Sequence, residues 1–362
     1  MKPKCLLGAV VLVSVTPVFA LGDEFWLGKQ VMPKETCRPV NNGRLVPFTQ
    51  LQLPSVVTKV EGDQLWIGAA WVNKSDMLLL SEAIAYYTRH LATSPNSAWA
   101  NSNLGAVYLA EGKLDLALAA FDMVIKGGTP SATDFNSRGF VYYKKGELDA
   151  AIADFTEALR LDPAYVFALS NRGLAWKAKG EFKNALNDHS LAIRLDPRQP
   201  GHFNNRGIVW AKLGEIDRAI DDFNQALQLK PTYVFALTNR GDSYKSKGDL
   251  QSALADYRKA IEIDPMDAYA YRSCADVWAT GGEKLRDGKQ AVDFATKACE
   301  LTRWREGESL QALAAALAET GDFSGAIESQ HKAIELMRQD PVSVAKGQER
   351  LALYKMGKPY RR

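Results

Sequence analysis

The stretch "YVFALSNRGLAWKAKGEF" at residues 165–182 returns, little changed, as "YVFALTNRGDSYKSKGDL" at residues 233–250. The two copies begin 68 residues apart, and single-residue markers recur at half that interval. The markers that keep a 34-residue step are Gly105, Gly139, Gly173, Gly207 and Gly241; Gly112, Gly146, Gly180, Gly214 and Gly248; Ala117, Ala151, Ala185, Ala219 and Ala253; and Pro163, Pro197, Pro231 and Pro265. A fixed period of this length indicates stacked structural repeats.

Each unit is predicted to be a pair of helices. In the unit at residues 166–199, apolar residues recur at helical spacing up to the turn Lys179-Gly180. A second amphipathic run, "EFKNALNDHSLAIRL", stops at Asp196-Pro197, because Pro cannot continue a helix. Small Gly and Ala residues at the eighth and twentieth positions let the two helices approach closely. One such hairpin cannot bury its apolar face alone, so we expect a mainly α solenoid of stacked hairpins.

The repeat pattern resembles that of the tetratricopeptide repeat (TPR) family: a 34-residue unit with a small Gly and an aromatic residue in its first helix, Ala–x3–Phe in its second and a closing Pro. The resemblance implies a right-handed superhelix of helix hairpins. The seven predicted units are 98–131, 132–165, 166–199, 200–233, 234–267, 268–306 with an insertion, and 307–340. We expect residues 77–97 to form a capping helix or half repeat, and residues 341–362 a C-terminal capping helix and tail.

The region before the repeats is predicted to hold a signal peptide and a small β domain. Residues 1–20 have a basic start, a short apolar run and the small-residue ending Val18-Phe19-Ala20, which is typical of a secretory signal peptide. In residues 21–76, "LPSVVTKV" and "DQLWIGAAWV" alternate like paired strands, which predicts a small all-β, barrel-like domain.

This front region and two later stretches, "EKLRDGKQAVDFATKACELTRW" and "ERLALYKMGKPYRR", resemble exported TPR proteins of planctomycete bacteria with an N-terminal Src-homology-3-like domain. The resemblance implies export to the periplasm or cell envelope of a bacterium.

Charge and cysteine content exclude several classes of function. The 362 residues include 45 basic and 42 acidic ones, and removing residues 1–20 leaves 43 basic residues against 42. A chain so nearly neutral gives no electrostatic reason to bind nucleic acid or an anionic membrane, and we expect no membrane span after cleavage. Cys37, Cys274 and Cys299 make no disulfide framework. Cys274 and Cys299 either pair after export or pack as small buried hydrophobes.

No pattern in the sequence indicates catalysis. The four His residues are scattered through the repeats and form no metal or Ser/His/Asp motif, and the Gly residues are turns between helices. His189 stands where neighbouring units have Phe155, Phe223 and Tyr257, so we expect it to pack as an aromatic ring. We therefore predict a protein that is not an enzyme and that needs no cofactor or metal.

One charged pair varies together across the units. The seventh position is Arg in units two to five, and the twenty-third position of the same units is Asp. Where Arg is absent, Asp is absent too, as in unit one with Leu104 and Ala120. We expect structural ion pairs between first and second helices, within or across units. The residues are Arg138, Asp154, Arg172, Asp188, Arg206, Asp222, Arg240 and Asp256.

The TPR resemblance also implies a binding groove. In that family, positions 2, 5, 6, 9, 12 and 13 of the first helix line the concave face. Mapped onto this chain, these positions give apolar anchors, a row of Asn residues able to bond an extended backbone, and Lys residues that favour an acidic peptide or a chain terminus. The predicted groove residues are Trp99, Asn136, Phe140, Tyr143, Lys144, Phe167, Asn171, Lys177, Asn204, Asn205, Lys212, Phe235, Asn239 and Lys245.

The sequence as a whole predicts an exported, non-catalytic scaffold or adaptor that binds an extended peptide or partner protein in the concave groove. Two alternatives stay open. The chain could be a cell-envelope assembly factor, with a wall-binding β domain and a solenoid that recruits an enzyme. It could instead be a regulatory subunit of an envelope enzyme.

Overall fold

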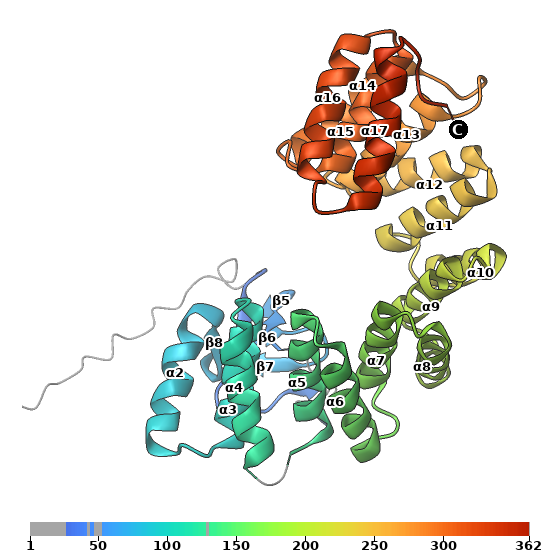
Figure 1. Cartoon of the computed structure of the whole chain (residues 1–362). Coiled ribbons are helices and arrows are strands. Elements are labelled where there is room, and N and C mark those ends of the chain that lie inside the picture. Colours follow the sequence, from blue (N-terminus) through green and yellow to red (C-terminus); the bar gives the residue numbers. More distant parts are fainter. Residues whose placement is uncertain (1–26, 42–43, 47–52, 128–129, 362) are drawn as a thin grey trace, which may run out of the picture. The chain divides into compact units, whose positions relative to one another are not determined.

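The computed structural model describes residues 27–41, 44–46, 53–127 and 130–361, which form a strand-rich region followed by paired helices (Figure 1). The prediction of a mainly α fold behind a small β region is confirmed. The predicted signal peptide lies outside the described residues. The chain divides into two compact units, one up to Leu161 and one from Asp162 onward, and each is described by itself.

The strand-rich region contains two antiparallel sheets. The strands are β1 (Gln30–Pro33), β2 (Val40–Asn41), β3 (Arg44–Leu45), β4 (Ser55–Val56), β5 (Lys59–Glu61), β6 (Gln64–Trp66), β7 (Trp71–Asn73) and β8 (Met77–Leu79). Their order is β4-β1-β8 in one sheet and β3-β2-β7-β6-β5 in the other. The predicted pairing of the segments "LPSVVTKV" and "DQLWIGAAWV" is present, with Val60 opposite Leu65. Because β8 pairs with β1, the region runs to Leu79 rather than ending at the predicted residue 76.

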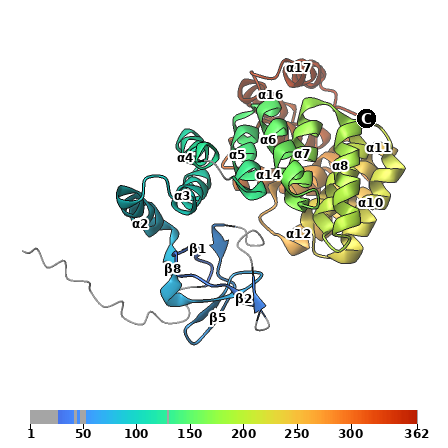
Figure 2. The ribbon, with the colours of Figure 1, turned by 90° about the horizontal axis from the view of Figure 1, so that it is seen from below.

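The β region and the first helix share a core. Helix α2 (Leu80–Thr93) leaves directly from β8 (Figure 2). The fully buried Tyr87 of α2 packs with Met32 and donates a hydrogen bond of 2.7 Å to the carbonyl oxygen of Pro33 in β1. The β region is therefore attached to the helices by a packed seam.

The remaining helices follow as pairs, and one further helix closes the chain. The first helices are α3 (Ala98–Ala110), α5 (Ala132–Lys145), α7 (Val166–Lys179), α9 (Pro200–Lys212), α11 (Val234–Lys247), α13 (Ala268–Thr280) and α15 (Gly307–Glu319). The second helices are α4 (Leu114–Lys126), α6 (Leu148–Leu161), α8 (Phe182–Leu195), α10 (Ile216–Leu229), α12 (Leu250–Ile263), α14 (Gly288–Leu301) and α16 (Phe323–Leu336). The closing helix is α17 (Pro341–Lys355).

Small residues set the spacing within each pair. Gly180 ends α7 in the left-handed conformation, with φ 85°, which turns the chain back into α8. A Cβ atom on Gly241 of α11 would lie 2.6 Å from the ring of Tyr257 on α12, and Gly207 stands against Phe223 in the same way. The glycine therefore lets an aromatic ring of the second helix rest on the backbone of the first.

The predicted Arg and Asp residues contact each other within the hairpins of units two to five. Each Arg donates from Nε and Nη2 to both carboxylate oxygens of the Asp sixteen residues later, over 2.6–2.8 Å. All four Asp residues are buried. The pairs are Arg138 with Asp154, Arg172 with Asp188, Arg206 with Asp222, and Arg240 with Asp256.

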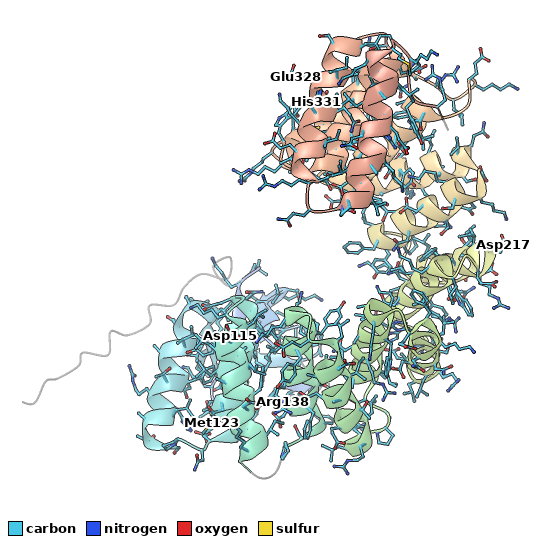
Figure 3. The ribbon with its side chains drawn as sticks, in the orientation of Figure 1. Asp115, Met123, Arg138, Asp217, Glu328 and His331 are labelled. Atoms are coloured by element: carbon cyan, nitrogen blue, oxygen red, sulfur yellow. The ribbon has the colours of Figure 1, made fainter. Side chains whose placement is uncertain are left out.

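The same Arg residues also reach the preceding hairpin. Arg138 Nη1 donates to Asp122 on α4 over 2.8 Å (Arg138 is labelled in Figure 3). Arg206 Nη1 donates to Ser190 on α8 over 3.2 Å, and Arg240 Nη1 to Asn224 on α10 over 2.6 Å. In these three cases, one guanidinium group joins three helices and so fixes the stacking of neighbouring units.

Two other predictions concern buried side chains of the second compact unit. Cys274 and Cys299 are separate free thiols, both fully buried in one apolar cluster with Leu313. His189 of α8 is also fully buried and stands over Gly173, where the equivalent units have aromatic rings. Neither ring nitrogen of His189 has a hydrogen-bond partner among the described residues. Burial first, and then the charge of Lys177, lower the pKa of His189 to about 3.

We predict that the buried carboxylate of Asp222 depends on its partner. Arg206→Leu removes both hydrogen bonds and leaves a buried charge, so we expect a loss of about 3 kcal/mol in the free energy of unfolding. The double variant Arg206→Leu with Asp222→Leu should lose much less, because no unpaired charge remains. Urea denaturation of the two variants measures the difference, and equal losses would contradict the pairing.

We also predict that His189 makes stability depend on pH. Its pKa is lowered in the folded state, so the unfolded chain binds more protons between about pH 6.5 and pH 3. Stability from the neutral ring is thus complete above about pH 6.5 and falls as the pH drops, by up to about 1.4 kcal/mol per pH unit.

His189→Phe should therefore be more stable than the parent, and its advantage should grow by about 2 kcal/mol from pH 8 to pH 5. Urea denaturation at both values measures this advantage. The control His331→Phe, at an exposed position on α16 (Figure 3), should leave the pH profile of the parent unchanged. A His189→Phe profile parallel to that of the parent would show that the ring does not titrate as argued.

Candidate functional site: the first-helix surface and its pocket

First helices of successive units lie next to each other. Within the second compact unit, α7 contacts α9, α9 contacts α11, and α13 packs closely on α15, whereas second helices of neighbouring units contact each other less. This arrangement brings the outward positions of the first helices together on one surface. We call the part of this surface formed by α7, α9 and α11 the first-helix surface.

Two aromatic rings stand out on the first-helix surface. Phe167, at the second position of α7, is 53% exposed, and Phe235, at the same position of α11, is 68% exposed. Each meets the edge of the tyrosine two residues before it, Tyr165 or Tyr233, at centroid distances of 6.0 and 6.1 Å. These contacts orient the rings but leave most of their surface in water.

The predicted anchors of the first compact unit are less available. Trp99 packs edge-on against Tyr87 at 5.4 Å and lies half-buried in the seam between α2 and α3, so less of its ring is available to a partner. Phe140 and Tyr143 on α5 stack on each other at 6.2 Å, and Lys144 Nζ lies 5.5 Å from the Phe140 ring centroid.

The Asn row is partly engaged within the protein. Asn204 is buried on α9 and accepts a hydrogen bond of 3.0 Å from Nδ2 of Asn239 on α11. Asn205 is half-buried on α9, Asn171 half-buried on α7, and Asn136 half-buried on α5. The Asn204–Asn239 bond ties neighbouring first helices together, so these two side chains have a structural role at this surface.

Cations of the first-helix surface differ in their pairing. Lys177 on α7 and Lys212 on α9 form no ion pair with any described residue. Burial, and in second place the charge of Lys212, lower the pKa of Lys177, which indicates that the two ammonium groups lie near each other. Lys245 on α11 is different, because its Nζ lies 3.5 Å from a carboxylate oxygen of Asp276. The predicted positive charge is therefore concentrated at Lys177 and Lys212.

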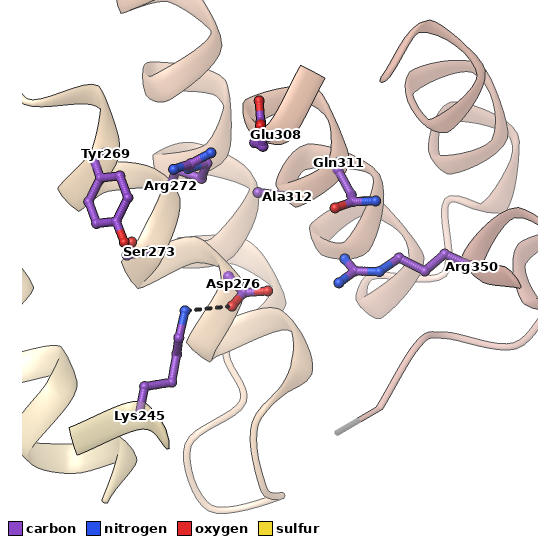
Figure 4. Close-up of a pocket in the computed structure, with 9 residues that line it drawn as sticks. All are labelled: Lys245, Tyr269, Arg272, Ser273, Asp276, Glu308, Gln311, Ala312 and Arg350. Atoms are coloured by element: carbon purple, nitrogen blue, oxygen red, sulfur yellow. Dashed lines mark ion pairs between the residues drawn. The ribbon is translucent and has the colours of Figure 1, made fainter. Parts of the chain in front are cut away.

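A pocket of about 160 Å³ lies further along the second compact unit, bounded by α11, α13, α15 and α17 (Figure 4). The lining residues are Lys245, Tyr269, Arg272, Ser273, Asp276, Glu308, Gln311, Ala312 and Arg350. Arg350 extends from α17 toward Gln311 and Asp276, and Lys245 reaches Asp276 from the opposite side (Figure 4). The walls are mostly polar and carry charges of both signs.

Sequence reasoning missed this pocket, although most of its signal was present. Tyr269 and Glu308 stand at the second position of the last two units, and Arg272 and Gln311 at the fifth. The groove residues predicted from the repeat end at Lys245 in the fifth unit, so these four residues are not among them. Arg350 could not have been found in this way, because α17 lies beyond the repeats.

Two further features are absent from the part of the chain that the structure describes. No group of three or more His, Cys, Asp or Glu side chains there could hold a metal ion. None of the described helices is long and apolar enough to cross a membrane.

Comparisons with known proteins agree with the geometry. Models described as TPR repeat match residues 139–180 and 241–280, and models described as tetratricopeptide repeat match residues 79–132 and 202–233. No curated protein matches the chain.

Several solved structures have a similar fold. A tetratricopeptide repeat protein from Parabacteroides merdae is 17% identical with a TM-score of 0.53, over 72% of this chain and 99% of its own. Cut9–Hcn1 of the APC/C is 16% identical with a TM-score of 0.58, over 75% of this chain and 52% of its own. A thermophilic TPR protein from Thermus thermophilus is 28% identical with a TM-score of 0.43, over 48% of this chain and 95% of its own.

The repeat period, the hairpin packing and the matches to the repeat models lead to one conclusion: the chain carries tetratricopeptide repeats, and its helices form a TPR solenoid.

Proposed function

We propose that this chain is a non-catalytic scaffold that holds an extended peptide of a partner protein on the first-helix surface. The observation that carries the proposal is the exposure of Phe235, of which 68% faces water. Large exposed aromatic side chains lose favourable burial, and at interfaces they are the residues that dominate affinity. Phe167 repeats the feature two units earlier, so the surface offers two anchors along one direction.

Charge indicates what kind of peptide fits. Lys177 and Lys212 are near each other and form no ion pair with a described residue, so an anionic group near both would relieve their repulsion. We therefore infer a peptide with apolar side chains for the two Phe residues and an Asp or Glu between them. An extended backbone suits this surface, because its anchors are spread over successive helices.

A selection of random peptides on the full chain tests this function. We expect the selected sequences to combine aromatic or aliphatic residues with Asp or Glu. A selected peptide should bind at least about tenfold more weakly to the variant Phe167→Ala, Lys177→Ala, Lys212→Ala, Phe235→Ala, which is about 1.4 kcal/mol or more. Its affinity for the parent should also fall as the salt concentration rises.

A matched variant controls for general effects of truncation. Leu195→Ala, Leu229→Ala, Lys183→Ala, Arg194→Ala removes two exposed apolar and two exposed basic side chains from second helices. It should bind the peptide within about twofold of the parent. Equal binding by the parent and the first-helix variant would move the site away from this surface.

We further propose that residues 1–20 are a signal peptide and that the protein works in the periplasm or cell envelope of a bacterium. The basic start, apolar run and small-residue ending of this segment support export. The short antiparallel strands with their own apolar cluster around Leu65 and Val72 support a Src-homology-3-like domain. This cluster, which is distinct from the one that β1 shares with α2, favours as a second function an envelope assembly factor whose β region binds the wall.

The export proposal has a direct test. N-terminal sequencing of the protein from a bacterial envelope fraction should begin at Leu21, because cleavage is expected after Ala20. Replacing Ala20 by Arg should block cleavage and leave the longer chain. A protein that still begins at Met1 in its native host, and stays with the cytoplasmic fraction, would contradict export.

A further inference from the structure

We propose that the pocket between α11, α13, α15 and α17 is a carboxylate-binding site, centred on Arg350 and Gln311. The site lies in the second compact unit, beyond the first-helix surface. In taking the carboxylate to come from a peptide, it rests on the function proposed above. The binding of a simple carboxylate can nevertheless be tested separately.

Two of the basic side chains that line the pocket are paired with carboxylates. Lys245 is paired with Asp276 at 3.5 Å. Arg272 Nη1 lies 3.6 Å from Glu306, just outside the pocket lining. Two of the three cations that face the cavity are therefore neutralised by neighbouring carboxylates.

Two hydrogen-bond donors of the pocket, Arg350 and Gln311, have no such carboxylate partner among the described residues. Arg350 forms no ion pair with any described residue, and Nε2 of Gln311 is buried without a hydrogen-bond partner in the described chain. Both groups are hydrogen-bond donors, and Arg350 extends toward Gln311 (Figure 4). A buried donor without an acceptor is unfavourable. An oxygen acceptor bound between these two residues would satisfy the buried Gln311 donor and pair the charge of Arg350.

The charge and shape of the groups in the pocket also favour a carboxylate. The pocket lining holds three cations, Lys245, Arg272 and Arg350, against the carboxylates of Asp276 and Glu308. Once the pairs Lys245–Asp276 and Arg272–Glu306 are counted, Arg350 and the carboxylate of Glu308 remain, so a singly charged anion at Arg350 meets less repulsion than a phosphate dianion would. A guanidinium group also presents two parallel N–H donors that match the two oxygens of a carboxylate.

Packing holds Arg350 in position for this role. Its guanidinium carbon lies 4.3 Å from the ring centroid of Tyr360 in the C-terminal tail. A cation held on an aromatic face keeps its in-plane N–H groups available to a ligand. The closing helix and the tail thus contribute a binding group that no repeat supplies.

Titration of the full chain with short peptides tests the site. The probes are acetyl-Gly-Gly-Gly with a free carboxyl terminus, its amide, and acetyl-Gly-Glu-Gly-amide, and the signal is the NMR resonance of the Arg350 Nε–H group. Saturable shifts with the free acid alone assign a chain terminus, and saturable shifts with the Glu peptide assign an acidic side chain. Either result supports the proposal. Equal binding of the carboxylate-free amide, or tighter binding of inorganic phosphate, would overturn it.

Three variants identify the groups involved, with binding of the carboxylate probe followed through the backbone amides of α15. Arg350→Ala should weaken binding at least tenfold. Arg350→Lys should weaken it less, because Lys keeps the positive charge but lacks the two parallel N–H donors of the guanidinium group. Gln311→Leu should weaken binding while raising the melting temperature, since it removes an unsatisfied buried donor. A purely structural glutamine would not change both quantities in opposite directions.

The control is Arg194→Ala, which removes an exposed Arg from α8. It should leave the affinity for the probe within twofold, whereas an Arg350→Ala variant that binds as well as the parent would overturn the proposal. The variant of the first-helix surface should still bind the carboxylate probe. Loss of peptide binding in that variant, with no carboxylate binding in the parent, would leave the proposed function standing and remove only this pocket.

Discussion

The arginine at the seventh position of units two to five is the interaction on which the stacking depends. Its side chain holds an Asp of its own hairpin with two hydrogen bonds, and Arg138, Arg206 and Arg240 are seen to reach an oxygen of the preceding hairpin as well. Hydrophobic contacts between helices tolerate sliding, but a planar fork with fixed acceptors does not. The hydrogen bonds of this Arg therefore set the register between neighbouring units. Small residues and aromatic rings set the distance between the two helices of each unit.

Units six and seven are packed together without an Arg at the seventh position. Cys274 and Leu313 replace the Arg there, and they belong to a buried apolar cluster with Cys299 and Met337. Helices α13 and α15 consequently pack closely on each other. With no Arg at the seventh position, buried apolar contacts take its place in the core between these hairpins, and the outward positions of the two helices line a pocket. The change in core chemistry and the appearance of the pocket thus fall in the same part of the chain.

Much of this could be predicted because the chain repeats. Comparing units within one sequence indicated the helix hairpins, the Arg and Asp pairs and the aromatic role of His189. Features that occur once were harder to predict. The seam that partly buries Trp99 depends on α2, and Arg350 comes from a helix outside the repeats. The pairing of Lys245 with Asp276 joins two units at positions that differ elsewhere, so no internal comparison could indicate it.

The Arg residues that stabilise the stack and the residues proposed to bind a peptide lie on opposite sides of the first helices. At roughly 100° per residue, positions 2, 5, 9 and 12 share one face, and position 7 lies roughly 180° from the middle of that face. The Arg residues can therefore hold the stack while Phe167, Phe235 and Lys177 vary without disturbing it. In the same way, position 2 reads Phe167, Gly201, Phe235, Tyr269 and Glu308 along the second compact unit. That change from apolar to charged side chains gives the surface a direction, so an extended peptide would meet different chemistry at its two ends.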